Sequence, residues 1–232
     1  MESTMERISN AIEDKKQIHH TVVNAHKLVS MKTNPVLRES VVHCDIINAD
    51  GMSVVWASKF LNRPLPERVA GIDLMQNLVD LAHRKNYKIY FFGAKEEIVK
   101  DVVSIYSAKY TEKVVAGYRN GYFNKGEEEE IARQIAGSGA NILFVAISSP
   151  TKEIFLNKYK HILKDVNFIM GVGGSFDVVA GKVKRAPEWL QKAGLEWFYR
   201  FLQEPGRMWK RNFDSNSKFI WMVFKEKFKG ER

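Results

Sequence analysis

The chain has 232 residues, of which 45% are hydrophobic. This is enough for one α/β domain, or one domain with an appendage, that needs no stabilising disulfide or metal ion. Its single cysteine, Cys44, lies in an apolar-flanked run and excludes a disulfide framework and a cysteine metal site. The N-terminus has no apolar signal segment, and no run approaches the roughly 18 apolar residues of a spanning helix. We therefore expect a cytoplasmic protein that is neither secreted nor integral to a membrane.

The positive charge is concentrated near the C-terminus. The whole chain has a formal net charge of +9, and residues 182–232 hold 13 lysines and arginines against 6 acidic residues, a net charge of +7. Such a segment suits an anionic membrane surface, a nucleic acid or a pyrophosphate ligand. Composition alone does not choose among these partners.

Short apolar runs alternate with amphipathic helical stretches along the chain. The runs predicted as strands are residues 17–23, 45–48, 88–92, 113–116, 141–145 and 167–170. They lack a clean polar alternation, which is typical of a mostly parallel sheet buried on both faces. We predict a Rossmann-like α/β fold with ligands at the carboxyl ends of the strands.

After about Lys182 the strands stop, and aromatic and basic residues accumulate. We predict a catalytic domain over residues 1–194 and a basic, aromatic, helical appendage over residues 195–232. Tryptophans beside basic residues favour a peripheral position on a membrane. Residues 218–229 are too short to span the bilayer but could lie in the headgroup layer as a helix. Docking onto the core or onto a partner subunit is the alternative.

Asp50 follows the second predicted strand and precedes Gly51 and a predicted helix over residues 52–60. A carboxylate at a strand end would face a cleft, where it could act as a base toward a hydroxyl. The alternative is that Asp50 caps the following helix, and the local pattern does not separate the two interpretations.

Two prolines make residues 63–73 a rigid loop that contains Arg68. An arginine there could neutralise a diphosphate through two hydrogen bonds. The alternative is a surface arginine paired with Glu67 or Asp73. On local pattern Asp73 is also a candidate for the base, or for a helix cap.

A glycine-rich turn, Gly171-Val172-Gly173-Gly174-Ser175-Phe176-Asp177, follows the last predicted strand directly. Its backbone N–H groups would suit a phosphate, and a purely structural tight turn is equally open. Phe176 stands where a dinucleotide-binding motif needs its third glycine, which disfavours a dehydrogenase. No nucleotide-triphosphatase loop and no Asp-x-Asp motif occurs. A diphosphate bound here would then be held by arginines or helix dipoles rather than by a metal, and we expect no cofactor.

Six motifs taken together carry a resemblance. They are Ala49-Asp50-Gly51-Met52, the run Leu65-Pro66-Glu67-Arg68-Val69-Ala70-Gly71-Ile72-Asp73, Phe91-Phe92-Gly93-Ala94, Gly117-Tyr118-x2-Gly121-Tyr122-Phe123, the glycine-rich turn continued by x3-Gly181-x3-Arg185-Ala186-Pro187, and Gly194-Leu195-Glu196-Trp197-x2-Arg200-x3-Glu204-Pro205-x-Arg207. Over roughly residues 22–213 the chain resembles the WecG/TagA/CpsF family of glycosyltransferases.

The resemblance implies an inverting transfer of N-acetylmannosamine, its uronic acid or a related hexose from a UDP-sugar to a polyprenyl-diphosphate-linked acceptor. This reaction would serve cell-surface polysaccharide synthesis at the inner face of the plasma membrane. The resemblance implies that Asp50 is the general base, that Arg68 contacts the donor diphosphate and that Asn24 lines the donor pocket. It also implies that Arg200, Arg207 and Lys210 or Arg211 close over the site from the appendage. The other predicted substrate-binding residues are Asp73, Gly93, Lys152, Glu153, Gly173, Gly174, Ser175, Asp177 and Arg185.

Two departures from the family pattern lie near the expected donor. Val22 stands where a threonine is common, and Lys152 replaces a glutamine. A cation at Lys152 could pair with an anionic donor such as a uronic acid. The departures also keep open an inactive scaffold homologue, against which the intact Asp50 and Arg68 argue. A nucleic-acid-binding protein that uses the basic tail is a further alternative, but it leaves the strand-end turns unexplained. An oligomer is compatible with the sequence.

Overall fold

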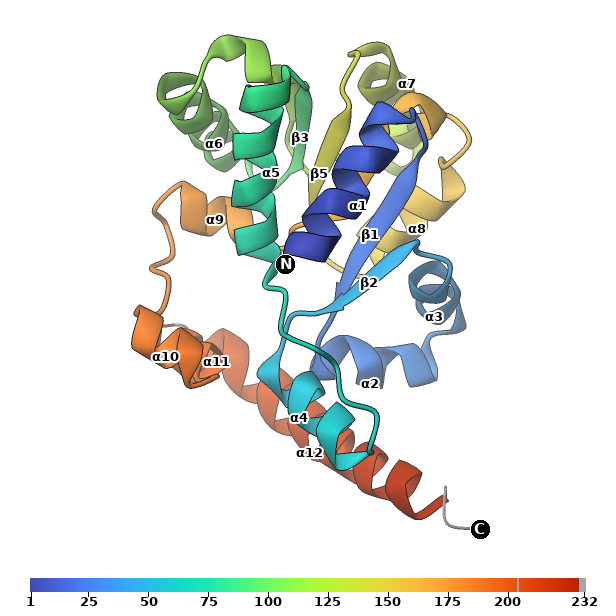
Figure 1. The fold of residues 1–232 in the computed structure, drawn as a ribbon, viewed down its shortest axis with the longest axis vertical. Helices are drawn as coiled ribbons and strands as arrows, with labels where there is room; N and C mark the ends of the chain where they lie inside the picture. Colours follow the sequence, from blue (N-terminus) through green and yellow to red (C-terminus); the bar gives the residue numbers. More distant parts are fainter. Residues whose placement is uncertain (204, 230–232) are drawn as a thin grey trace. The chain divides into compact units, whose positions relative to one another are not determined.

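A computed structural model describes residues 1–203 and 205–229, and the chain divides into two compact units (Figure 1). Unit 1 comprises Met1–Thr21, Glu39–Ile47 and Gly71–Val183. Unit 2 comprises Val22–Arg38, Asn48–Ala70 and Lys184–Arg232. The predicted appendage falls in unit 2 together with two earlier segments of the chain, and its role at a membrane stays a prediction.

All six predicted strands are present, and the predicted α/β fold is confirmed. They form one parallel sheet in the order β2-β1-β6-β5-β3-β4. The strands are β1 (Ile18–Val23), β2 (Ile46–Ala49), β3 (Ile89–Gly93), β4 (Val115–Arg119), β5 (Ile142–Ala146) and β6 (Phe168–Gly171).

Helices connect the strands and continue after the last of them. The first group is α1 (Glu2–Glu13), α2 (Ala25–Thr33), α3 (Pro35–Val42), α4 (Met52–Phe60), α5 (Gly71–Lys85) and α6 (Glu96–Lys109). The second group is α7 (Glu128–Gly137), α8 (Thr151–Lys158), α9 (Ser175–Val179), α10 (Glu188–Lys192), α11 (Glu196–Gln203) and α12 (Pro205–Lys229). Short 3-10 turns lie at Glu112–Val114, Lys125–Glu127 and Leu163–Asp165.

The core of unit 1 covers the sheet on both faces. Neighbouring residues of β3 point to opposite sides, since Phe91 packs against Tyr106 of α6 and Phe176 of α9, whereas Phe92 packs against Phe155 of α8. Helix α1 packs against β6 and α5 (Figure 1). Both phenylalanines of β3 are fully buried. Burial on both faces explains why the strand sequences show no polar alternation.

The loops after β3, β4 and β5 pack closely at the carboxyl edge of the sheet. Gly93 has a φ of +125°, and a Cβ atom placed on it would lie 2.5 Å from the carbonyl group of Ala146. A Cβ atom on Gly121 would lie 3.1 Å from the Cα of Gly93. At position 93 only glycine permits both the close approach and the backbone conformation. The glycines therefore bring the strand-end loops of unit 1 together.

The fold of unit 2 places α12 along α2. Nδ1 of His26 lies 2.7 Å from Oγ of Ser215, and Phe219 of α12 is 5% exposed. The ring of Phe60 in α4 meets that of Phe224 edge to face, with centroids 5.3 Å apart. The predicted helix over residues 218–229 is confirmed. One face of it docks on α2 and α4 within unit 2.

One buried histidine of the sheet makes stability depend on pH. Burial, together with Lys160, lowers the pKa of His19 in β1 from 6.5 to about 4, although Asp45 acts in the opposite direction. Its Nε2 atom is buried without a hydrogen-bond partner among the described residues. Between pH 6.5 and 4 the unfolded chain therefore binds a proton that the folded chain rejects. Stability contributed by the neutral ring is present above this window and is lost as the pH falls through it.

We expect His19→Gln to lose less stability than the natural chain on acidification from pH 7 to pH 4.5, by about 2 kcal/mol. Urea unfolding at pH 7 and at about pH 4.5 measures the difference. Carboxylates titrate in both proteins, so the comparison of the two slopes isolates His19. An equally steep loss in the variant would contradict the prediction.

Candidate active site

Asp50 is the first residue after β2 and lies at the carboxyl end of that strand. Its main-chain N–H donates to the carbonyl oxygen of Val23, at 3.0 Å, which ties it to the end of β1. Helix α4 begins at Met52 as predicted, but its N-cap is Gly51 and no side chain caps it. The capping interpretation of Asp50 is therefore wrong. The half-buried Asp50 stands where a base was predicted.

Asn24 follows β1 and begins α2. Its side-chain oxygen accepts the main-chain N–H of Lys27, at 2.9 Å, which makes Asn24 the N-cap of this helix. A Cβ atom placed on Gly51 would lie 3.6 Å from the Cβ of Asn24. Asn24 therefore lies beside the turn that carries Asp50, and its place in the donor pocket stays a prediction.

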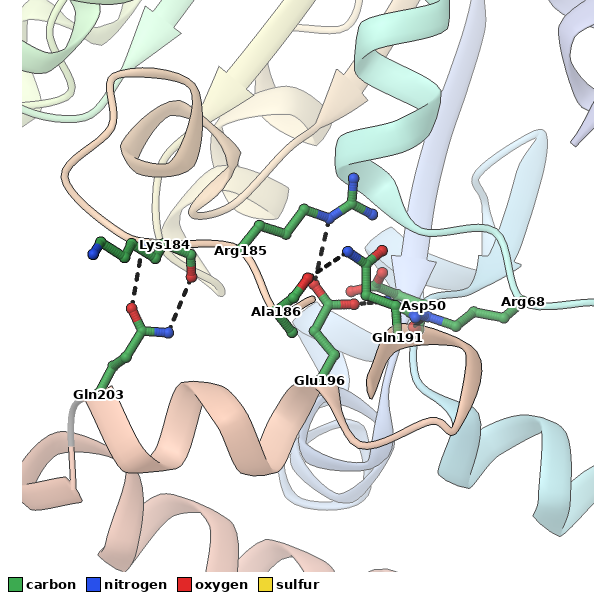
Figure 2. A network of polar contacts seen from close by, with 8 residues as sticks. All are labelled: Asp50, Arg68, Lys184, Arg185, Ala186, Gln191, Glu196 and Gln203. Atoms are coloured by element: carbon green, nitrogen blue, oxygen red, sulfur yellow. Dashed lines mark hydrogen bonds and ion pairs between the residues drawn. The ribbon is translucent and has the colours of Figure 1, made fainter. Parts of the chain in front are cut away.

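Arg68 is tied to the same turn through its guanidinium (Figure 2). Its Nε donates to the main-chain oxygen of Asp50 at 2.5 Å, and its Nη2 donates to Oε2 of Glu196 at 2.5 Å. The neighbouring Val69 donates its N–H to the carbonyl of Ala49 at 2.9 Å, which holds the loop against β2. Arg68 is only 18% exposed and is not a surface arginine. Its partner is Glu196, and not Glu67 or Asp73.

The guanidinium of Arg68 keeps donors for a ligand. It has five N–H groups, of which one on Nε and one on Nη2 are used by Asp50 and Glu196. The other three have no partner within the part of the chain that the structure describes. A partly buried guanidinium with unused donors is suited to binding a phosphate group.

Glu196 joins a second arginine to the first. Nε of Arg185 lies 3.8 Å from Oε1 of Glu196, so the guanidinium groups of Arg68 and Arg185 approach different oxygens of one carboxylate (Figure 2). The side chains of Arg185 and Glu196 are 24% and 26% exposed. The group of three carries a net positive charge in a partly buried position, which favours an anionic ligand.

Two glutamines hold the segment that carries Arg185 (Figure 2). The side chain of Gln203 in α11 accepts the N–H of Lys184 at 3.2 Å and donates to its carbonyl at 3.0 Å. Gln191 of α10 donates to the carbonyl of Ala186 at 2.6 Å. The backbone on both sides of Arg185 is thus fixed by α10 and α11.

The turn between α10 and α11 packs on the start of α4. Gly194 has a φ of +74°, and a Cβ atom placed on it would lie 2.8 Å from Cγ of Met52. Only glycine combines this conformation with this contact. Glu196, two residues later, is therefore carried to the turn that follows Asp50.

In unit 1 the glycine-rich turn runs from the end of β6 to the start of α9, so the predicted strand and turn are confirmed. Gly173 has a φ of +55°, and Gly174 is the N-cap of α9. The hydroxyl of Ser175 donates to the carbonyl of Val172 at 2.7 Å and so stabilises the turn itself. Asp177 accepts the N–H of Lys182 at its main-chain oxygen. Phosphate binding by this turn stays a prediction.

Lys152 and Glu153 lie in the first turn of α8, and both are buried, at 7% and 6% exposed. Nζ of Lys152 lies 3.5 Å from Oε1 of Glu153. A Cβ atom placed on Gly171 would lie 2.7 Å from this Nζ. The ammonium group of Lys152 therefore lies beside the start of the glycine-rich turn, within unit 1.

The structure places the remaining predicted substrate-binding residues in different parts of the chain. Asp73 is the third residue of α5, inside its first turn. Gly93 has the packing role described above, and its contact with substrate stays a prediction. Arg200 lies in α11 and Arg207 and Arg211 in α12, but their side chains fall outside the described part of the structure, as does that of Lys210.

Sequence reasoning gave no role to Glu196, Gln191 or Gln203. Glu196 stood inside the motif Leu195-Glu196-Trp197, which was the available signal. Nothing local indicates that its partner is Arg68, because the two residues are 128 positions apart.

Comparison with known proteins shows which family the chain belongs to. The sequence pattern described as "Glycosyl transferase WecG/TagA/CpsF family" matches residues 1–232. The chain belongs to this family. It is 40% identical, over 182 residues, to the N-acetylglucosaminyldiphosphoundecaprenol N-acetyl-beta-D-mannosaminyltransferase of Bacillus subtilis, covering 78% of this chain and 69% of that one. The enzyme of the same name from Bacillus spizizenii is 36% identical over 192 residues, which cover 83% and 73%.

The protein is therefore a glycosyltransferase of the WecG/TagA/CpsF family, as its motifs predicted. Within the described ranges, none of its helices combines the length and apolar character needed to cross a bilayer. The segment from α10 to α12, with the turn between α10 and α11, nevertheless exposes many large apolar side chains. These are Trp189, Leu195, Trp197, Phe198, Leu202, Ile220, Trp221, Phe224 and Phe228.

Proposed function

We propose that this glycosyltransferase moves N-acetylmannosamine, its uronic acid or a related hexose from a UDP-sugar to a polyprenyl-diphosphate-linked acceptor, in the synthesis of a cell-surface polysaccharide. The names of the two relatives support the sugar and the acceptor. The observation that carries the proposal is the pairing of Asp50 with Arg68. A residue able to act as a base and a guanidinium with unused donors meet at the same strand end.

In the proposed reaction the carboxylate of Asp50 takes the proton of the acceptor hydroxyl as its oxygen attacks the anomeric carbon. The bond from that carbon to the UDP oxygen breaks on the opposite face, so the configuration inverts. Negative charge grows on the departing diphosphate, and the donors of Arg68, with Arg185 beside it, stabilise that charge. The contributions proposed for Lys152 and the glycine-rich turn rest on the sequence motifs.

Metal independence is part of the proposal. Two arginines gathered by one carboxylate supply positive charge where other glycosyltransferases use a divalent cation. The sequence also lacks the Asp-x-Asp motif that holds such a cation.

The direct experiment measures sugar transfer to a polyprenyl-diphosphate-linked N-acetylglucosamine acceptor from a panel of neutral and uronic UDP-sugars, with and without EDTA. We expect transfer from at least one donor, an unchanged rate in EDTA, and an inverted anomeric configuration in the product by NMR. No transfer from any donor would contradict the proposed reaction, and loss of transfer in EDTA would contradict its metal independence.

Peripheral membrane binding through α12 is the second part of the proposal. Trp221 and Phe228 are seven residues apart, two helical turns, and both are exposed, whereas Phe219 on the docked face is buried. Phe224 lies between them and is 45% exposed, although its ring also meets that of Phe60. Lysines lie along the same helix, where they can contact anionic headgroups. An exposed aromatic stripe beside lysines is suited to the interfacial layer of a membrane.

We expect the double variant Trp221→Ser, Phe228→Ser to bind vesicles containing anionic phospholipid at least about tenfold more weakly, because two large apolar side chains leave the interface. Co-sedimentation with vesicles measures the binding. The matched control is Ile105→Ser with Tyr122→Ser, which removes two exposed apolar side chains from unit 1. Equal binding by the double variant and the natural chain would contradict the membrane role of α12.

A further inference from the structure

Glu196 has no part in the chemistry described so far, yet it is the contact between the two arginines of the site. Its Oε2 lies 2.5 Å from Nη2 of Arg68, and its Oε1 lies 3.8 Å from Nε of Arg185. It is the first residue of α11 and lies two residues after the turn that packs on α4. The carboxylate is therefore held in place by the backbone of α11.

The contacts of Arg68 fix the orientation of its guanidinium plane. The Nε contact with the main chain of Asp50 alone would leave the far end of the group free to swing. The Nη2 contact with Glu196 adds a second point at a different nitrogen. A planar group held at two of its nitrogens presents its remaining donors in one direction, which a bidentate contact with a diphosphate requires.

We propose that Glu196 is a positioning residue for sugar transfer, which holds Arg68 in the orientation that receives the diphosphate of the donor. This inference rests on the proposed function, in which Arg68 stabilises that diphosphate. Glu196 does not itself touch substrate in this scheme. Its effect on the reaction passes through the guanidinium that it holds.

Charge and positioning predict opposite effects for Glu196→Gln. Removing an anion beside two arginines raises the local positive charge, so charge alone would tighten binding of UDP and leave turnover unchanged or faster. Loss of positioning lowers the rate at saturating donor, because Arg68 no longer meets the developing charge in a fixed orientation. We expect kcat to fall about tenfold, while KM for the donor does not rise.

A double-mutant cycle tests whether Glu196 acts through Arg68. We expect Glu196→Gln to lower kcat about tenfold in the natural chain and by less than about twofold in an Arg68→Lys background. Glu39→Gln, which removes an exposed carboxylate from α3, is the control for lost charge and should leave kcat unchanged. Glu196→Asp keeps the charge with a shorter reach and should give an intermediate rate if the glutamine variant fails to fold. Equal losses in both backgrounds, or no loss, would overturn the proposal.

A second measurement needs no substrate and separates this inference from the proposed function. The Nε–H signal of Arg68, assigned by its absence in Arg68→Lys, should exchange with water at least severalfold faster in Glu196→Gln than in the natural chain or in Glu39→Gln. Unchanged exchange would overturn the positioning role. A natural chain that transfers no sugar would instead contradict the proposed function, and the exchange rates would still decide whether Glu196 holds Arg68.

Discussion

Replacing Asp50 by asparagine is expected to lower kcat about a thousandfold, because general-base catalysis contributes on the order of 10² to 10⁴ to such a rate. The amide has the shape of the carboxylate but cannot take the proton of the acceptor hydroxyl. The contacts of residue 50 to Val23 and Arg68 use main-chain atoms and persist in the variant. We therefore expect the variant to fold. Initial rates at saturating donor and acceptor, with calorimetric binding of UDP, measure the effect.

The matched control for this change is Asp165→Asn, which removes the charge of an exposed aspartate in unit 1. It should transfer sugar at the rate of the natural chain. Natural turnover by Asp50→Asn would show that another group takes the proton. Asp73, the other candidate on sequence pattern, would then be the next residue to replace.

Arg68→Ala is expected to lower kcat/KM by about a hundredfold or more, because one well-placed donor to a developing anion contributes about that factor. It should also lower stability by roughly 1 to 3 kcal/mol, since the carbonyl of Asp50 and the carboxylate of Glu196 each lose a charged partner. The side chains of Arg68 and Glu196 are only 18% and 26% exposed, so water replaces the lost contacts incompletely. Steady-state kinetics and urea unfolding measure the two effects.

Arg63→Ala is the control, because Arg63 lies in the same loop but is exposed. It should change neither quantity measurably. Arg68→Lys keeps the positive charge but loses the planar fork, and its activity should lie between those of the natural chain and Arg68→Ala. Natural kinetics in Arg68→Ala would exclude Arg68 from the reaction.

The sheet could be predicted from the sequence, because each strand is a separate apolar run bounded by turn residues. The bounds of β4 could not be predicted in this way. The apolar run predicted a strand over residues 113–116, but the strand is Val115–Arg119. The hydroxyl of Thr111 accepts the N–H of Lys113, which starts a 3-10 turn over Glu112–Val114 and delays the strand. Apolar periodicity does not report such a side-chain cap.

The candidate site could be predicted only in part. The position of Asp50 could be predicted because its signal is local, a carboxyl residue directly after a strand, whereas its assignment as the base came from the resemblance and stays a proposal. The partner of Arg68 was not found, because local reasoning offers only neighbours such as Glu67, and the actual partner is 128 residues away. The capping alternative for Asp50 stayed open because a glycine N-cap in an extended conformation, here Gly51, leaves no side-chain signature.

Unit 2 is assembled from three separate stretches of the chain, and this has a consequence for biosynthesis. Asp50 and Arg68 leave the ribosome early, but Glu196 and the helices that pack on α2 and α4 belong to the last stretch, which begins at Lys184. At roughly 5 to 20 residues per second, on the order of ten seconds of translation separates them. A nascent chain that has not reached Lys184 has Asp50 and Arg68 but lacks the carboxylate of Glu196 that contacts both arginines. Assembly of these contacts therefore waits for synthesis of the stretch that begins at Lys184.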